Sequence, residues 1–522
     1  MGKPRVLAIA ASVVLIAGLV ALASVGGSSQ GSGRHGQASS TAGSAPGATD
    51  GSASVASSDS VVATGGAGSS GTGKAGQANP SGPGARNASS GSGAATAAGS
   101  GAGAAGFLPA GKGVHGVTDK VIQVGIPTMD YAAVADAGFA PGGGSNSQID
   151  DSFAVKAATD WINGHGGIAG RKLQVVEYRV DVRTESTASG RQQQDAMACS
   201  SFTQDHHVFA MSGDNMTEDN YLECAKQSQT PAVFSSIGNT APSSSRLASM
   251  TNYWYAPTGF VADRREHAMA KFVLQQKFLK PGDTFALITQ DLPSIREAVD
   301  KQMKPVLKAA GLTPAAEVVY SDGLSNDWNT RILQFQQHVP PVTKIVFSAT
   351  TQDMFAAYAF MRAAESQNYH PDYALGSDEH PNQLNLGTSA NQLAHVFAMG
   401  WMPWSDVGDS TDLTASTHEC AQAMTAEGIS ASPPNYASCE FLFFLRNAFK
   451  YAPELSAAGL AAGVAKMGGS YSPVFARSAR YGAGRHDGAD QVRELRYGVQ
   501  PQACGGSSAC LHYTTGPFPV PD

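Results

Sequence analysis

The residues of this sequence with catalytic potential do not form a recognisable active site. A Gly-x-Ser-x-Gly pattern occurs at Gly27–Gly31, and a pattern like a phosphate-binding loop occurs at Gly68–Lys74. Both patterns need a flanking strand and helix, and both lie in a low-complexity tract that predicts neither. The adjacent acids Asp378 and Glu379 have no evident base or nucleophile beside them in the sequence. We therefore expect no enzymatic activity and no cofactor.

The six cysteines are the other reactive side chains. In an exported chain, which the N-terminus described below indicates, an even number of cysteines favours disulfides. Metal binding is the weaker interpretation, because no Cys-x-x-Cys pair occurs and the adjacent His206 and His207 lack a ligand partner at helical spacing. Six cysteines allow fifteen pairings, and loop closure favours the nearest neighbours. The expected pairs are Cys199–Cys224, Cys420–Cys439 and Cys504–Cys510.

The N-terminus has the pattern of a secretory signal. The basic residues Met1–Arg5 precede an apolar run, Val6–Ala23, that ends in the small-x-small sequence accepted by signal peptidases. We expect either a cleaved signal peptide over residues 1–23, with Ser24 as the first mature residue, or an uncleaved membrane anchor of the same extent. Residues 24–106 are almost entirely Gly, Ser, Ala and Thr, which predicts a disordered linker.

The charge of the chain argues against nucleic acid as a partner. The formal net charge is −7 at pH 7, and charged residues make up 15% of the sequence. Proteins that bind nucleic acid present basic surface to the phosphates, and this composition offers none.

From about Val117 onward, short apolar runs alternate with helix-length amphipathic segments. The runs predict strands at Val121–Pro127, Lys172–Val180, Val208–Ser212, Pro231–Ser236, Thr284–Gln290, Glu317–Ser321, Lys344–Ala349, Tyr373–Ser377 and Val396–Trp401. Helices are expected near 149–163, 187–204, 217–228, 294–310, 328–337, 352–364, 436–450 and 456–466, before a Gly/Tyr-rich tail. This alternation indicates βαβ units, with parallel sheets covered by helices on both faces.

One segment is more specific than the general α/β pattern. Residues 160–173 read Asp-Trp-Ile-Asn-Gly-His-Gly-Gly-Ile-Ala-Gly-Arg-Lys-Leu, between the first predicted helix and the second strand. Its glycines permit backbone conformations closed to other residues, and Ile168 fills the turn from the core side. The segment resembles the helix-to-strand turn of the leucine/isoleucine/valine-binding proteins of ABC transporters, members of the periplasmic-binding-protein type I superfamily. The resemblance extends over about residues 118–515.

This resemblance implies a two-lobed periplasmic-binding-protein type I fold, in which each lobe is a parallel sheet flanked by helices. In that family three crossovers join the lobes, so each lobe is discontinuous in sequence. Residues 118–254 and 395–480 would form lobe one, and residues 255–394 and 481–522 would form lobe two. The resemblance also implies a solute bound between the lobes, closure by hinge motion, and docking of the closed form on a permease.

By the same resemblance, hydroxyl and backbone N–H groups after the third and fourth strands of lobe one bind the solute. The matching positions are Ser212 after the third strand, and Ser235 and Ser236 after the fourth. Such groups at the start of a helix suit a carboxylate, and helix capping is their alternative role. Tyr131, just past the first strand, would stack on the solute or cover the hinge.

Acidic residues follow two strands of the implied lobe two. Asp291 comes after one strand, and Asp378 and Glu379 come after another. A carboxylate at such a position would accept hydrogen bonds from a ligand ammonium group, and a capping or solvated acid is the alternative. The Tyr-Gly usual in the family after the first strand of lobe two is replaced by residues 292–294, Leu-Pro-Ser, which leaves amino-acid specificity open.

The sequence therefore predicts an extracytoplasmic solute-binding protein of a bacterial ABC importer, secreted or anchored at the cell surface. Its solute would be an amino acid or a related small polar compound. The expected partners are that solute, a permease and, if residues 1–23 are not cleaved, the membrane. The alternative is a ligand-sensing ectodomain of a signalling system, because the same fold serves in receptors.

Overall fold

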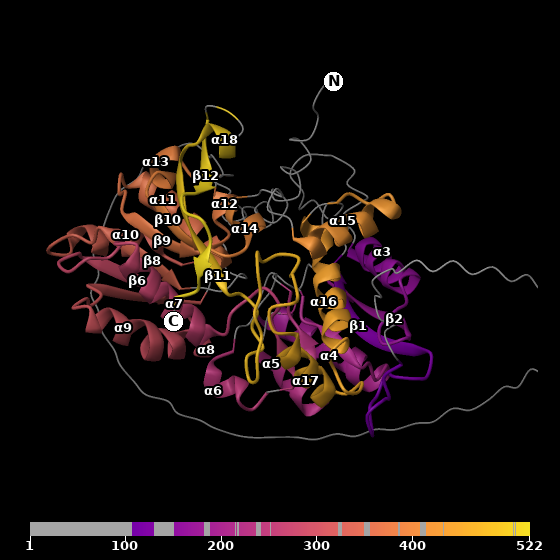
Figure 1. The fold of residues 1–522 in the computed structure, drawn as a ribbon. Helices are drawn as coiled ribbons and strands as arrows, with labels where there is room; N and C mark the ends of the chain where they lie inside the picture. Colours follow the sequence, from indigo (N-terminus) through magenta and orange to yellow (C-terminus); the bar gives the residue numbers. More distant parts are fainter. Residues whose placement is uncertain are drawn as a thin grey trace, which may run out of the picture. The chain divides into compact units, whose positions relative to one another are not determined.

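Figure 1 shows the fold in a computed structural model of the chain, and its labels for helices and strands are used below. The structure describes residues 107–129, 151–181, 188–214, 216, 219–235, 242–250, 252–321, 326–348, 355–384, 387–407, 414–431, 433–504, 506 and 508–521. Residues 1–106, Tyr131 and Ser236 lie outside the described residues, so the expected signal, linker and two candidate contacts do too. Of the described helices, none combines the length and the apolar character that a membrane span needs.

The first sheet consists of five parallel strands in the order β2-β1-β3-β4-β5. Its strands are β1 (Val121–Met129), β2 (Lys172–Val180), β3 (Ala210–Ser212), β4 (Ala232–Val233) and β5 (Trp254–Tyr255). β1 is a nearly continuous apolar run because it lies inside the sheet with both faces covered. β2 alternates polar and apolar residues because it is an edge strand with one exposed face.

Helices from two distant parts of the sequence cover the first sheet. The early helices are α3 (Asp151–Gly164), α4 (Ala188–Ser200) with the π-turn Ser201–Asp205, α5 (Asp219–Gln227) and α6 (Ser244–Leu247). The late helices are α15 (Ala415–Ala426), α16 (Pro433–Phe449) and α17 (Ala457–Met467). One core unites α3 and β1 with the late helices, and Figure 1 shows α15 and α16 beside α3. A second core, under α4 and α5, covers the other face.

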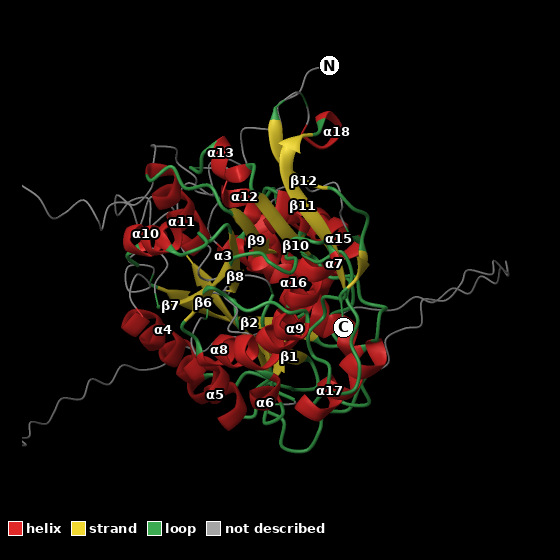
Figure 2. Ribbon diagram, turned by 90° about the vertical axis from the view of Figure 1, so that its left-hand side faces the viewer, coloured by secondary structure: helices red, strands yellow, loops and turns green. Residues whose placement is uncertain are grey.

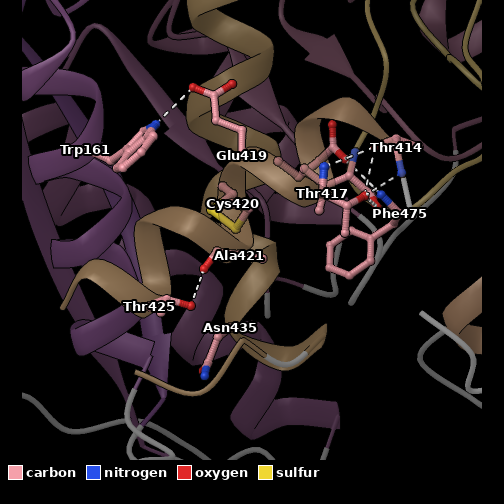
Figure 3. The surroundings of a disulfide bond; sticks show 12 residues. Trp161, Thr414, Thr417, Glu419, Cys420, Ala421, Thr425, Asn435 and Phe475 are labelled. Carbon is pink, nitrogen blue, oxygen red and sulfur yellow. Dashed lines mark hydrogen bonds between the residues drawn. A yellow bond between two sulfur atoms is a disulfide. The ribbon is translucent and has the colours of Figure 1, made fainter. Parts of the chain in front are cut away.

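A disulfide joins two of the late helices, and a hydrogen bond from Trp161 connects them to α3 (Figure 3). Cys420 of α15 bonds Cys439 of α16. The neighbouring Glu419 accepts a hydrogen bond from Trp161 of α3 at 3.0 Å and pairs with Arg446 of α16 at 2.6 Å. The other disulfides are Cys199–Cys224, between α4 and α5, and Cys504–Cys510, between α18 (Pro501–Cys504) and β12 (Ala509–Tyr513). These are the neighbouring pairs expected from the sequence.

The second sheet follows the order β12-β11-β10-β9-β8-β6-β7, with β13 paired to β11. Its strands are β6 (Phe285–Gln290), β7 (Ala316–Tyr320), β8 (Lys344–Ser348), β9 (Asp372–Gly376), β10 (Val396–Gly400), β11 (Gln491–Val499), β12 (Ala509–Tyr513) and β13 (Phe518–Pro519). β6 to β10 are parallel, whereas β11, β12 and β13 join in antiparallel pairs. Figure 2 shows β11 and β12 continuing the sheet beyond β10.

Helices cover both faces of the second sheet. They are α7 (Ala262–Gln275), α8 (Pro293–Ala298), the π-turn Val299–Met303, α9 (Lys304–Ala309), α10 (Trp328–Gln337), α11 (Phe355–Ser366), the 3-10 turn Ser377–Glu379, α12 (Pro381–Leu384), α13 (Ala390–Leu393) and α14 (Pro403–Val407). Leu287 and Val346 point to a core with α7, α8 and α9, while Ile288 and Phe347 point to a core with α10 and α11. Successive residues of a strand face opposite sides, which is why each strand supplies both cores.

The structure corrects two of the sequence predictions about the lobes. Residues 396–400 were assigned to lobe one, but β10 pairs with β9, from Val396 opposite Tyr373 to Met399 opposite Gly376, and so belongs to the second sheet. The second sheet is also not purely parallel, because the predicted tail forms β11, β12 and β13. A buried apolar run shows that a strand exists, and it does not show which sheet the strand joins.

The glycine-rich turn after α3 has the geometry expected of it. Gly167 has φ of 72°, and a Cβ there would lie 1.9 Å from the carbonyl oxygen of Arg171. The Arg171 side chain donates to the carbonyl oxygens of Thr118 at 2.6 Å and Leu108 at 2.8 Å, and its guanidinium lies over the Phe107 ring. The turn therefore also fixes the first described residues of the chain to the first sheet.

Candidate functional site

The strand order of each sheet indicates where a ligand would bind. In open parallel sheets, ligands bind beyond the carboxyl ends of the strands, at the point where the strand order reverses. That point lies between β1 and β3 in the first sheet, and between β6 and β8 in the second. Polar side chains at these strand ends are therefore the first candidates for solute contacts.

Asp214, just beyond β3, is the centre of a buried polar group at the first of these points. Its Oδ2 accepts a hydrogen bond from Ser212 Oγ at 2.7 Å, and its Oδ1 accepts from the Ser235 N–H at 2.9 Å and from the Ser235 hydroxyl. Burial raises the pKa of Asp214 to about 6, although the bonds from both serines favour the charged form. Two serines after neighbouring strands are thus joined by one carboxylate.

Both serines are also fixed through their backbone carbonyl groups. Tyr221 of α5 donates its hydroxyl to the carbonyl oxygen of Ser212 at 2.6 Å, and Thr258 donates to the carbonyl oxygen of Ser235. Ser212 and Ser235 are fully buried, and both hydroxyls donate to Asp214. The donors that the sequence assigned to a solute carboxylate are therefore bonded to a carboxylate of the chain itself.

Arg265 of α7 is the centre of a second buried polar group, beside the end of β9. Its Nε lies 2.7 Å from Asp378 Oδ2, its Nη2 lies 3.1 Å from Glu379 Oε1, and its Nη1 lies 2.9 Å from Glu266 Oε1. The Arg265, Glu266 and Glu379 side chains are almost fully buried, whereas the Asp378 side chain is 15% exposed. One guanidinium thus faces three carboxylates, and Asp378 is the carboxylate that reaches the surface.

The Arg265 group contains three acidic side chains and one basic side chain, and the pKa values of all three acids are raised. Burial raises the pKa of Glu379 to about 8, against the opposing effect of Arg265. Burial likewise raises the pKa values of Asp378 and Glu266. Burial alone would lower the pKa of Arg265, but the three carboxylates outweigh it and raise that pKa. The guanidinium therefore stays charged, while the carboxyls tend to retain protons.

A third buried acid makes the turn after β9 rigid. Asp406 of α14 accepts from the Ser377 hydroxyl at 2.6 Å and from the Tyr513 hydroxyl at 2.8 Å. Ser377 Oγ in turn accepts from the backbone N–H groups of Trp401 at 2.7 Å and Met402 at 3.1 Å. Burial raises the pKa of Asp406 to about 7. The ends of β9 and β10, α14 and β12 are joined here, which fixes the backbone from which Asp378 projects.

A sequence-family model described as periplasmic binding protein matches residues 141–493, which is more than half of the chain. The chain belongs to the periplasmic binding protein family. No curated protein sequence matches this binding protein. The resemblance predicted from the helix-to-strand turn is thereby confirmed.

Solved structures with the same fold are distant in sequence. One is a solute-binding protein of an ABC transporter from R. palustris in complex with 4-hydroxybenzoate, with 12% identity, a TM-score of 0.54, and coverage of 77% of this chain and 98% of that one. Another is a possible leucine/isoleucine/valine-binding protein from Rhodopirellula baltica SH 1, with 14% identity, a TM-score of 0.52, and coverage of 76% and 96%. A third is a fatty acid ABC transporter substrate-binding protein from Thermomonospora curvata, with 15% identity, a TM-score of 0.51, and coverage of 78% and 96%.

These matches confirm the two-lobed periplasmic-binding-protein type I fold, and they are matches to binding proteins rather than enzymes. Membership of the family implies a location outside the cytoplasm and a small-molecule ligand. Within the described part of this binding protein, Cys504, Cys510 and His512 lie close enough together to suggest metal ligands. The two cysteines form a disulfide, however, so they offer no thiolates.

The structure brings together some of the candidates and separates others. Ser212 and Ser235 meet at Asp214, and Asp378 and Glu379 meet at Arg265. Asp291 follows β6, where its side chain is 40% exposed and pairs with Arg296 at 3.0 Å. Within the part of the chain that the structure describes, Asp291 therefore belongs to neither buried group.

Three of the residues that organise these groups were not identified from the sequence. Arg265 and Glu266 lie in a charged stretch that is typical of an exposed helix start. A signal was present, because Arg265 shares one helix face with the buried residues Ala268, Met269 and Phe272, at spacings of i+3, i+4 and i+7. Asp214 had been given no role, since sequence spacing does not show which donors a carboxylate meets.

Proposed function

We propose that this periplasmic binding protein is the extracytoplasmic solute receptor of an ABC importer. The proposal rests on one observation above all: buried, pre-organised polar groups lie at the carboxyl ends of strands in both sheets of a periplasmic-binding-protein fold. Such strand ends are where α/β proteins bind small molecules. The similar solved structures from R. palustris and Thermomonospora curvata, both described as belonging to ABC transporters, support the transport role.

Under this proposal the two polar groups contact a small polar solute from opposite lobes. The Asp214 carboxylate, which Ser212 and Ser235 hold in place, supplies the contact from lobe one. Asp378 supplies the contact from lobe two, because its carboxylate is the partly exposed one of the Arg265 group. Glu379 orients the turn through a bond from the Gly376 N–H at 2.5 Å. Tyr131, Ser236 and Asp291 remain candidates for further contacts.

Two of the connecting segments would form the hinge. Ala256 donates its N–H to the carbonyl oxygen of His486 at 3.0 Å, and Gly488 donates to the carbonyl oxygen of Ala256 at 2.8 Å. The buried Asp487 carboxylate accepts from the Val261 N–H at 3.1 Å and pairs with Arg264 at 2.5 Å. The first and last connections therefore run side by side as one joint, which suits a bending motion of two rigid lobes.

The N-terminal part would place this receptor at the cell surface. Residues 1–23 act as a cleaved signal peptide or as an anchor, and residues 24–106 act as the linker. Mass spectrometry of the N-terminal peptide from the purified mature protein distinguishes the two cases. An N-terminus at Ser24 indicates cleavage, whereas a peptide that retains the apolar run indicates an anchor.

The experiment that tests solute binding combines a thermal-shift screen with small-angle X-ray scattering on the full chain. We expect one solute class to raise the melting temperature in a concentration-dependent way, because ligands that bind only the folded state stabilise it. The same solute should reduce the radius of gyration. Asp378→Asn should weaken both effects, while Asp372→Asn, at the opposite end of β9, should weaken neither. A broad panel without any shift would contradict the receptor proposal.

A further inference from the structure

The buried group around Asp214 restricts the chemistry of the solute. A solute carboxylate would require the Ser212 hydroxyl, the Ser235 hydroxyl and the Ser235 N–H as donors. All three already donate to Asp214. The carboxylate of a solute at this place would also lie next to that of Asp214, and like charges held close together in a buried site repel strongly.

The Arg265 group has the same preference for positive charge. Its one guanidinium is already engaged by Glu266, Asp378 and Glu379. Glu266 is 1% exposed, yet within the described part of the chain neither of its carboxylate oxygens accepts a well-aligned hydrogen bond. Its close partners are Arg265, at 2.9 Å, and the Ser348 hydroxyl. Buried acceptors with poorly aligned donors are costly, and a ligand that brings N–H groups would satisfy them.

We propose that the solute is an organic cation, an amine or a guanidinium compound, that carries no free carboxylate. This inference rests on the proposed receptor function and narrows its solute class. A cation supplies positive charge and N–H donors to both groups, through charge-assisted hydrogen bonds to Asp214 on one side and to Asp378 or Glu266 on the other. An α-amino acid would satisfy one group with its ammonium and place its carboxylate against the other group.

The test uses pairs of compounds that differ only in the carboxylate. Isothermal titration calorimetry on the full chain compares agmatine with arginine, cadaverine with lysine and isoamylamine with leucine, and adds 4-methylpentanoate as a carboxylate without an amine. We expect at least one amine or guanidinium compound to bind, and its amino-acid counterpart to bind at least tenfold more weakly.

Two variants connect that preference to the structure. Asp214→Asn should weaken binding of the cation at least tenfold and reduce the difference between the members of each pair. Asp205→Asn is the matched control, because Asp205 is exposed and precedes β3, whereas Asp214 follows β3. The affinity of this control variant for the cation should stay within twofold of that of the parent protein. If Asp214→Asn does not fold, as judged by its melting transition, Glu266→Gln tests the second group in the same way.

The outcomes separate the inference from the function on which it rests. Binding of amines alone, with loss in Asp214→Asn, supports both. Binding of amino acids or 4-methylpentanoate with equal or higher affinity overturns the inference and leaves the receptor function intact. Binding of none of these compounds, together with no shift in the broader panel, overturns both.

Discussion

Replacement of Arg265 by methionine tests whether the three acids around it depend on its charge. The guanidinium lies 2.9 Å from Glu266, 2.7 Å from Asp378 and 3.1 Å from Glu379, and its side chain is 3% exposed. Methionine is also long and unbranched, so it fills much of the same space while removing the charge. Removing one partner of a buried ion pair costs about 3–5 kcal/mol, because the remaining charge is uncompensated. We expect Arg265→Met to lower the free energy of unfolding by about this amount at pH 7.5.

The loss should depend on pH in a defined direction. Glu379 has a pKa of about 8 in the folded chain, above its ordinary value of 4.5, so the folded state binds a proton that the unfolded state releases. Its contribution to stability is therefore fully present at low pH and is lost as the pH rises from about 4.5 to 8. Without Arg265 the pKa values of all three acids should rise further. The free energy of unfolding of Arg265→Met should then be closer to that of the parent protein at pH 5 than at pH 8.

Urea denaturation of the full chain at pH 5 and pH 8 measures both effects. Arg296→Met is the matched control, since it removes the same group from an exposed ion pair with Asp291 of 3.0 Å. Exposed pairs contribute only about 0–1 kcal/mol, so this control should change little at either pH. A loss below about 1 kcal/mol for Arg265→Met at pH 8, or the same loss at both pH values, would show that the acids do not need the arginine.

Three further perturbations test other parts of the fold. Replacing Cys420 and Cys439 together by serine opens a loop with a sequence separation of 19, which should cost about 3 kcal/mol in a denaturant titration. Asp406→Asn should flatten the dependence of melting temperature on pH between about 4 and 7, because the raised pKa of Asp406 makes the parent less stable as the pH rises through that range. Gly167→Ala should cost about 2 kcal/mol or more, since the new Cβ meets a carbonyl oxygen at 1.9 Å, and Gly166→Ala, which meets nothing within 4 Å, should cost less. An equal loss for the two alanine variants would contradict the steric explanation.

Much of the alternation of strands and helices could be read from the sequence, because buried parallel strands and amphipathic helices leave clear patterns. The strand predicted at Lys172–Val180 and the helix predicted at 328–337 have the observed bounds. The helix-to-strand turn also identified the family, because its glycines adopt backbone conformations that residues with a Cβ cannot adopt without strain.

Other features depended on contacts that no local pattern reveals. β5 has two residues, and β11 to β13 lie in a segment rich in Gly and Tyr, so neither showed a strand pattern. The helix α15 was likewise not predicted; the segment Ala415–Ala426 has little contrast between its faces. The serines after β3 and β4 were identified, but their bonds to Asp214 depend on how two strands lie together in space, which spacing along the chain does not determine.

The mixed origin of the first core has a consequence for when the chain folds. Trp161 and Glu419, which share a hydrogen bond in that core, are 258 residues apart in the sequence. The apolar face of β1 and α3 gains its cover only when α15, α16 and α17 are present. Contacts between such distant segments form slowly, since a long loop must close first. A chain that is still being synthesised therefore cannot complete this lobe until the residues of α17 have been made.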